Sequence, residues 1–290
     1  MRAQPARCGN FSEMGANMEH LFDVLKGFAV GASMTVPGVS GGTMAMIIGV
    51  YDRLITAVSR IFSEPKKHIW FLLKFCAGGV AGVLLLAGLI TWALDTPAGL
   101  PLRFAFMGAV AGGIPLIFRK AGLKKIYIKS IPPILTGVVV VVLLAQLPEG
   151  LFSPSREGLA AAAVQLAGGV IVAAALVLPG ISASHMMYML GIYEPVMDSV
   201  SRFDVISLLP MAAGLIAGTF LTARLLEKLL ERHSQGCYLV ILGFMAGSLR
   251  ELIPEGADGV QLMLGAACAV IGFAIVKTIC DREKAKAAAN

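Results

Sequence analysis

Proline, glycine and serine residues recur at the same spacing in two places within otherwise apolar sequence, and each copy ends in a residue with a polar side chain, a threonine or a histidine. The two copies read Pro-Gly-Val-Ser-Gly-Gly-Thr over 37–43 and Pro-Gly-Ile-Ser-Ala-Ser-His over 179–185. Proline ends a helix at the residue before it, glycine permits a turn, and the serine that follows can cap a new helix. A helix N-terminus carries unpaired N–H groups and a partial positive charge, so each copy is suited to hold an anion such as phosphate.

The last residues of each motif would line such a site with N–H groups and side chains. The candidate substrate-binding residues are Ser40, Gly41, Gly42 and Thr43 in the first copy, and Ser182, Ala183, Ser184 and His185 in the second. Histidine can change its charge near neutral pH, so His185 is also a candidate for coupling to protons. Alternatively, each motif only kinks a helix that its serines cap locally. Two copies at matching places favour the binding site.

Each motif is followed by a Gly-aliphatic-Tyr-acid tetrad, which ends in Asp52 or Glu194. Ionisable groups inside a membrane are costly and usually functional, so both acids are candidates for carrying a coupling proton. Ion pairs at the membrane surface, with Arg53 and Arg202, are an equally good interpretation.

Arg53, Arg103 and Arg250 are candidates for attracting an anionic headgroup. Arg103 and Arg250 stand near acid-leaning loops, where isolated cations are unusual. Contact with lipid phosphate, or an ion pair such as that of Arg250 with Glu251, is the alternative for each.

The composition indicates an integral membrane protein. Of the 290 residues, 57% are hydrophobic and 14% are charged, and the mean hydropathy is +0.80. A soluble domain of this size has fewer apolar and more charged residues. The five cysteines form no CxxC or Cys/His spacing, so neither a metal site nor a cofactor is predicted. Nucleic-acid binding is not expected, because no basic stripe lies on a soluble domain.

The chain is an internal duplication. Residues 27–54 and 169–196 are identical at nine of 28 positions. Ten apolar segments follow one another near 20–36, 42–62, 69–94, 102–118, 126–147, 159–178, 184–201, 205–230, 236–252 and 259–279. Five segments per half would place the second half upside-down relative to the first. We therefore predict an all-α fold of two inverted-topology repeats, with broken or re-entrant helices at the two motifs and a half-helix at 20–36.

The predicted organisation has five parts. They are a disordered N-terminal tail (1–18), a first membrane repeat (19–147), a linker (148–158), a second membrane repeat (159–280) and a C-terminal cytoplasmic tail (281–290). Two small-xxx-small spacings occur in each half, which let helix backbones approach closely. They are Gly78/Gly82, matched by Gly214/Gly218, and Gly108/Gly112, matched by Gly243/Gly247.

Lys and Arg are clustered, and acid-leaning loops separate the clusters. The clusters include Arg53, Arg60, Lys66 and Lys67; Arg119, Lys120, Lys124, Lys125 and Lys129; Arg224, Lys228 and Arg232; and Lys277, Arg282, Lys284 and Lys286. Under the positive-inside rule these clusters face the cytoplasm.

At the two motifs the chain resembles a bacterial and archaeal membrane family associated with polyprenyl-phosphate translocation, the PopT family. The family pattern is Pro-Gly-Val-Ser-Gly-Gly-Thr and then Gly-x-Tyr-Glu in the first half, and Pro-Gly-Ile-Ser-Gly-Ser in the second. Residues 37–43 match throughout, with Asp52 in place of the usual Glu. In the second half Ala183 replaces a glycine, and His185 an apolar or aromatic residue. The similarity extends over about 20–280.

The resemblance implies a flippase of the inner membrane that returns undecaprenyl phosphate, a carrier lipid of cell-envelope synthesis, to the cytoplasmic leaflet. The coupling ion is left open, with a proton as one choice, and a homo-oligomer is compatible with the sequence. An undecaprenyl diphosphatase-like enzyme is a weaker alternative, because that family carries an arginine in its motif where this chain has Gly41 or Ala183. A small-ion carrier or channel of the same architecture is the third interpretation.

Overall fold

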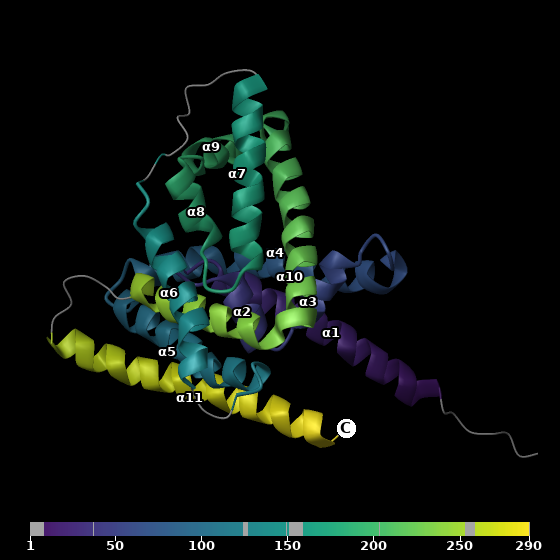
Figure 1. The fold of residues 1–290 in the computed structure, drawn as a ribbon, viewed down its shortest axis with the longest axis vertical. Coiled ribbons are helices and arrows are strands. Elements are labelled where there is room, and N and C mark those ends of the chain that lie inside the picture. The colour runs from purple at the N-terminus through teal and green to yellow at the C-terminus, as the bar shows by residue number, and fades with distance from the viewer. Residues whose placement is uncertain are drawn as a thin grey trace, which may run out of the picture.

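The computed structural model describes residues 9–36, 38–123, 127–148, 150, 159–202, 204–252 and 259–289. Within these ranges the chain is helical and contains no strand, so the predicted all-α fold is confirmed. The helices (Figure 1) are α1 (Gly9–Ser33), α2 (Gly41–Ile47), α3 (Tyr51–Ser59), α4 (Pro65–Leu94), α5 (Gly99–Lys120), η1 (Ile128–Ser130), α6 (Ile131–Ala145), α7 (Leu159–Val177), α8 (Ala183–Leu190), α9 (Tyr193–Ser201), α10 (Val205–Ser248), η2 (Leu249–Leu252) and α11 (Gly259–Ala289).

Five helical stretches of the described chain are long and apolar enough to cross a membrane. They are Pro65–Leu94, Gly99–Lys120, Ile128–Ala145, Val205–Ser248 and Gly259–Asp281. Large apolar side chains point outward from them, including Leu84, Ile216 and Met263, each more than 70% exposed. Such side chains suit contact with lipid rather than water. The protein is therefore a multi-pass membrane protein.

The two segments that follow the motifs are helical hairpins. Segment 42–62 consists of α2 and α3, and segment 184–201 consists of α8 and α9. Each hairpin turns at a glycine in the left-handed region, Gly49 at φ 76° and Gly191 at φ 69°. Segment 20–36 contains the C-terminal part of the 25-residue helix α1 and the residues that follow it, and a half-helix or re-entrant hairpin there stays a prediction.

Helix α10 joins two segments that the sequence separates, 205–230 and 236–252. A straight helix of its 44 residues would be about 66 Å long, twice the hydrocarbon thickness of a bilayer. The backbone departs from helical geometry at His233 (φ −134°, ψ 46°) and the chain bends sharply there (Figure 1). The two parts of α10, before and after His233, therefore correspond to the two predicted segments.

Helices also extend into both predicted tails. Helix α1 begins at Gly9, inside the range 1–18, and α11 continues through Ala289, inside the range 281–290. Once a helix is anchored by packing, each added residue gains a hydrogen bond without a new nucleation cost. The Ala, Lys and Glu residues after Asp281 have high helix propensity as well. Most of the predicted linker lies outside the described residues.

Glycines set the closest helix contacts, and these contacts recur in both halves. Helix α1 packs against α4, and α7 packs against the first part of α10. A Cβ on Gly78 would lie 2.1 Å from the Val24 carbonyl oxygen, and a Cβ on Gly214 would lie 2.1 Å from that of Leu166. Leu166 and Gly214 follow Val24 and Gly78 by 142 and 136 residues, so one contact is built twice.

A second duplicated contact joins the halves to each other. Helix α5 packs against α11, and α6 packs against the second part of α10. A Cβ on Gly108 would lie 1.9 Å from the Ala269 carbonyl oxygen, and one on Gly243 would lie 2.1 Å from that of Ile134. Both partners follow their counterparts by 135 residues. Close packing at the small-xxx-small spacings is thus confirmed, while the opposite orientation of the halves in the membrane stays a prediction.

We predict that Gly78→Ala destabilises the protein and that Gly88→Ala on the same helix does not. The methyl group at position 78 would meet the backbone of α1, whereas nothing lies within 4 Å of the position at Gly88. Forced packing of this kind lowers the free energy of unfolding by about 1–3 kcal/mol, whereas an unhindered Gly→Ala change in a helix raises it by up to about 1 kcal/mol. Unfolding in detergent is the measurement. Equal midpoints for the two variants would contradict the packing described.

Candidate functional site

Both motifs break a helix in the same way. Helix α1 ends before the first motif and α2 begins within it, and α7 and α8 flank the break in the second. Gly38 and Gly180 adopt φ of 81° and 84°. Ser40 (φ −82°, ψ 131°) and Ser182 (φ −85°, ψ 121°) then take the extended geometry of helix N-caps. The predicted order of helix, break and new N-terminus is confirmed in both copies, and Pro37 lies outside the described residues.

The two breaks contact each other. A Cβ on Gly42 would lie 3.1 Å from the Cα of Pro179, so the N-terminus of α2 lies directly against the second break. The buried Tyr51 hydroxyl donates a hydrogen bond to the Val177 carbonyl oxygen at 2.9 Å. Val177 is the last residue of α7, and its carbonyl is one that the end of a helix leaves without a helical partner. The tyrosine of the first tetrad therefore anchors the second motif.

Three motif side chains have buried polar atoms without a protein partner. They are the Ser40 Oγ, the Thr43 Oγ1 and the His185 Nε2, and the two hydroxyl residues are 5% and 1% exposed. Ser182 differs, because its Oγ accepts a hydrogen bond from the His185 N–H at 3.4 Å. The predicted serine cap thus forms in the second copy only. A buried polar group without a partner costs about 1–3 kcal/mol, and a ligand would remove this cost.

The other candidate motif residues surround these atoms unequally. Gly41 and Gly42 are buried, Ala183 is half-buried, and Ser184 is exposed. An apolar cavity of about 210 Å³ lies beside Gly41 and Gly42, with Met34 and Val177 among its lining residues. The first motif is therefore adjacent to space that suits hydrocarbon rather than water.

Asp52 is held by residues that sequence reasoning did not find. The Lys120 ammonium pairs with its carboxylate, and the Tyr238 hydroxyl donates to it at 3.0 Å. The predicted partner Arg53 instead forms two hydrogen bonds to the buried Asp23, at 2.7 and 3.2 Å. Asp52 and Arg53 are adjacent in α3, and adjacent residues on a helix do not face each other.

Further ion pairs gather the basic clusters at one end of the molecule, which we call the basic end. Arg60 bonds to Glu227 at 2.7 Å and to Glu231 at 2.8 Å, which joins α3 to the first part of α10. Arg119 bonds to Asp281 at 3.3 Å, which joins α5 to α11. With the pair of Asp52 and Lys120, these contacts close the basic end around α3.

The second hairpin is much less constrained. Glu194 is exposed and lines a hollow of about 240 Å³ at the turn between α8 and α9. Tyr193 stacks on Tyr188 at 4.0 Å between ring centroids, unlike its counterpart Tyr51. The alternative interpretation, a pair of Glu194 with Arg202, is not what the structure has, since Arg202 bonds to Asp198 at 2.9 Å. Residues 198 and 202 are one helical turn apart, whereas 194 and 202 are two turns apart.

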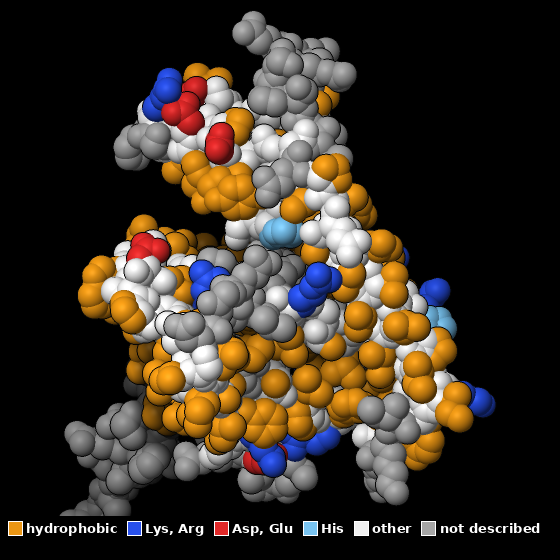
Figure 2. Space-filling model, turned by 90° about the vertical axis from the view of Figure 1, so that its left-hand side faces the viewer, with side chains coloured by type: hydrophobic (Ala, Val, Ile, Leu, Met, Phe, Trp, Pro, Cys, Tyr) orange, Lys and Arg blue, Asp and Glu red, His pale blue; other side chains and the backbone are white. Residues whose placement is uncertain are grey.

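Arg103 lies near the start of α5, opposite Lys120, and η2, which carries Arg250, packs against α5; we call the start of α5 with η2 the open end. Arg103 is half-buried near the start of α5, and Arg250 is exposed on η2, which packs against α5. Figure 2 shows a deep hollow between the upper part of the molecule and its main body, with acidic side chains above it. Lys or Arg side chains and a histidine lie along its lower side. The two predicted cations thus lie at an end that the ion pairs above do not close.

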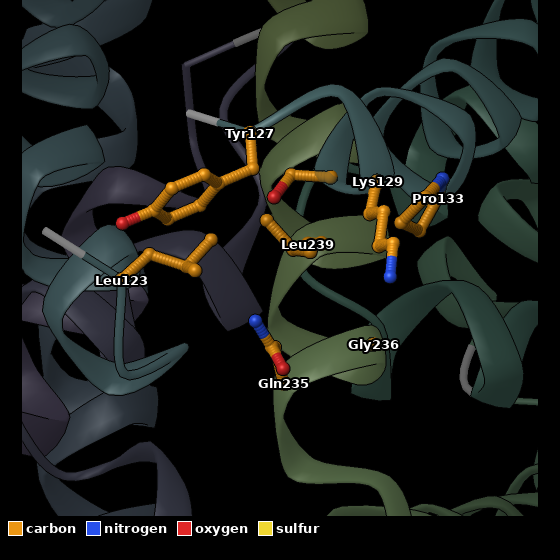
Figure 3. Close-up of a pocket in the computed structure, with 8 residues that line it drawn as sticks. Leu123, Tyr127, Lys129, Pro133, Gln235, Gly236 and Leu239 are labelled. Atoms are coloured by element: carbon orange, nitrogen blue, oxygen red, sulfur yellow. The ribbon is translucent and has the colours of Figure 1, made fainter. Parts of the chain in front are cut away.

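A third pocket, of about 350 Å³, lies beside the kink of α10 (Figure 3). Lys129, Tyr127 and Gln235 contribute polar groups, and Leu239 forms an apolar wall. A cation beside hydroxyl and amide groups can bind an anion at the basic end. No local sequence pattern indicates this pocket, because its two sides are more than a hundred residues apart in the chain. No group of metal-ligating side chains is found within the described chain.

Comparisons with known proteins agree with one another. The family model described as undecaprenyl phosphate translocase-like matches residues 30–267. A polyprenyl-phosphate transporter of Vibrio cholerae serotype O1 is 29% identical over 255 residues, which cover 83% of this chain and 80% of that protein. A polyprenyl-phosphate transporter of Staphylococcus aureus is 27% identical over 272 residues, 89% of this chain and 95% of that protein. No solved structure matches the chain.

We predict that Thr43→Val weakens binding of a short-chain polyprenyl phosphate without destabilising the protein. The hydroxyl has no protein partner, so its removal breaks no bond within the fold. A hydrogen bond to a charged group contributes about 1.5–3 kcal/mol, so binding should weaken about tenfold or more. Titration calorimetry in detergent measures the affinity.

The control is Ser248→Ala, which removes a buried hydroxyl that donates to the Met245 carbonyl oxygen at 3.0 Å. It should leave the affinity unchanged. Normal binding by Thr43→Val would remove this hydroxyl from the site.

Proposed function

Because the chain belongs to the undecaprenyl phosphate translocase-like family, we propose that it transports a polyprenyl phosphate such as undecaprenyl phosphate between the leaflets of the cytoplasmic membrane. The observation that carries this proposal is the meeting of the two helix breaks at Gly42 and Pro179. Ser40, Thr43 and His185, which belong to the two motifs, have buried polar atoms without protein partners, and this supports a shared site. A phosphate group would satisfy them.

The headgroup binds at the junction of the motifs, and the polyprenyl chain stays in lipid. The Ser40 and Thr43 hydroxyls donate to phosphate oxygens, and a protonated His185 donates from Nε2. The N-terminus of α8 adds N–H groups, and a partly buried helix terminus contributes up to about 2 kcal/mol toward an anion. The apolar cavity beside Gly41 and Gly42 accepts hydrocarbon close to the headgroup.

The headgroup enters at the open end. Arg103 and Arg250 lie there, and a cation half-buried in a low-dielectric wall attracts phosphate more strongly than one in water. The basic end faces the cytoplasm under the positive-inside rule, and its ion pairs around α3 keep it closed. The conformation is thus ready to accept lipid from the outer leaflet, which fits recycling of a carrier lipid. Arg53 takes no part, since Asp23 occupies its guanidinium.

Transport is coupled to ion movement, with a proton as our choice. His185 faces the headgroup site and can carry a proton with the phosphate. Glu194 is exposed and Asp52 is held at the basic end. In this proposal the two acids of the tetrads sample opposite sides. The sequence contains no GxxxxGK[ST] loop, which argues against direct use of ATP.

We do not assign phosphatase activity to this chain. Gly41 and Ala183 occupy the motif positions where the diphosphatase family has an arginine, and phosphoryl transfer needs such a charge on the transferring group. The acid pair Glu227/Glu231, which could supply acid–base groups, is bound to Arg60 at the basic end. A lateral hollow also fits a lipid better than a small ion, for which an axial pore would suffice.

The test is leaflet exchange of undecaprenyl phosphate in liposomes that contain the purified protein. We expect protein-dependent exchange of the phosphate, no exchange of the uncharged polyprenol, and no phosphate released from undecaprenyl diphosphate. The double variant Ser40→Ala with Ser182→Ala should fold and should exchange at least about tenfold more slowly, because two hydroxyl groups at the site are lost.

Folded protein that does not exchange undecaprenyl phosphate, with or without a pH gradient, would contradict the proposed function. Release of phosphate would favour the enzyme instead.

A further inference from the structure

The duplication places charged residues at equivalent positions at the two ends of the molecule. Residue offsets between the halves are constant within each group of helices: 142 for Gly38/Gly180 and Gly49/Gly191, 136 for Gly78/Gly214, and 135 for Gly108/Gly243. Each offset is supported by matching backbone geometry or a matching interhelical contact. The offsets therefore give the residue in the other half that is equivalent to each residue of the basic end.

The first pair of equivalent positions involves the acid of each tetrad. At the basic end, Asp52 on α3 accepts a hydrogen bond from Tyr238 on α10. The counterpart of Asp52 is Glu194, and the counterpart of Tyr238 is Arg103 on α5. A carboxylate and a guanidinium thus occupy the equivalent positions.

The second position involves the arginine near the end of each hairpin. At the basic end, Arg60 bonds to Glu231 at 2.8 Å. The counterpart of Arg60 is Arg202, and at the offset for α4 the counterpart of Glu231 is Asp95. The equivalent positions again carry opposite charges. In each half the arginine directly follows the second helix of the hairpin, and the acid lies at the end of the long helix that comes next, which is α4 or the first part of α10.

These counterparts are apart in the present conformation. Glu194, Arg103 and Asp95 make no side-chain hydrogen bond or ion pair within the described chain, and Arg202 bonds only to Asp198, one turn away. Helix α3 packs against α10 at the basic end, whereas α9 packs chiefly on its neighbours α8 and α10.

We infer that Glu194–Arg103 and Arg202–Asp95 are the ion pairs that close the open end in the alternate conformation of the transport cycle. This inference rests on the proposed function, since alternate closure is needed only if the protein carries its substrate across. Inverted repeats achieve such closure when each half takes the conformation of the other. The exchange releases α3 from α10 and docks α9 against α4 and α5.

Arg103 then has two successive partners. While the end is open, its guanidinium attracts the phosphate; when the headgroup has moved to the motifs, the Glu194 carboxylate takes its place. At the basic end the cation that pairs with the tetrad acid is Lys120. The counterpart of Lys120 is an acid, Glu255, which lies outside the described residues. Arg103 therefore takes the role of this cation in the proposed pair with Glu194. Arg103 thus binds the phosphate in one state and the Glu194 carboxylate in the other. This exchange of partners links substrate binding to closure of the open end.

Charge reversal tests the first pair in the intact protein. Arg103→Glu and Glu194→Arg should each slow leaflet exchange by about tenfold or more. The combined variant should exchange faster than either single variant, because the swap restores the pair, but slower than the unmodified protein, because position 103 no longer attracts the phosphate. The matched control is Arg250→Glu with Glu194→Arg, which has a cation from the same end but no counterpart pairing, and which should not recover. A double swap no faster than its slower single variant would overturn the inference.

Cysteine cross-linking tests the closure without relying on transport. Arg103→Cys with Glu194→Cys, in a variant lacking the five natural cysteines but still folded, should be cross-linked by a short bis-methanethiosulfonate reagent, because a salt-bridged Arg and Glu can hold their Cα atoms farther apart than the about 7 Å that a direct disulfide allows. Arg250→Cys with Glu194→Cys should not. Cross-linking in a protein that exchanges no lipid would support the gate and contradict the proposed function. Exchange without any 103–194 cross-link would overturn the gate alone.

Discussion

A helix broken inside a membrane exposes backbone N–H and carbonyl groups that lipid cannot satisfy, and the arrangement of this protein follows from that constraint. The chain breaks twice, at Gly38 and at Gly180, so both breaks must be enclosed by protein. They are placed against each other at Gly42 and Pro179, and the Tyr51 hydroxyl satisfies a carbonyl at the end of α7. Glycine contacts between the long helices bring the surrounding walls close enough to shield them. The N–H groups and hydroxyls that remain form the proposed phosphate site.

The two halves are built alike but are in different states. Tyr51 is buried and bonded across the junction, whereas Tyr193 stacks on a neighbour at the edge of a hollow. Asp52 is held by Lys120 and Tyr238, whereas Glu194 is exposed. Related halves in different conformations are what a transporter needs, since one side must close while the other opens. The ion pairs at the basic end are partly exposed, so each contributes little alone and can be exchanged at low cost.

Much of the fold, and the residues proposed for the centre of the site, could be predicted from local sequence patterns. The breaks, the hairpins and the glycine contacts were predictable because proline, glycine and small-xxx-small spacings act over a few residues. Partners distant in the chain were not: Arg53 was the partner of Asp52 in one of two interpretations, and the observed partner Tyr238 is 186 residues away. Arg53 was expected at the headgroup but binds Asp23 across a helix interface. The length of α1, the pocket at Lys129 and the unequal closure of the two ends also depend on tertiary packing, which no local pattern encodes.

The most direct test of the central claim is a structure of the protein with bound polyprenyl phosphate, determined in lipid nanodiscs. The account predicts phosphate density at the junction of the two breaks, within hydrogen-bonding distance of the Ser40 and Thr43 hydroxyls and the His185 imidazole, with the prenyl chain leaving sideways into lipid. Phosphate bound only in the pocket of Lys129 and Tyr127, with the motif hydroxyls still without a ligand, would contradict it.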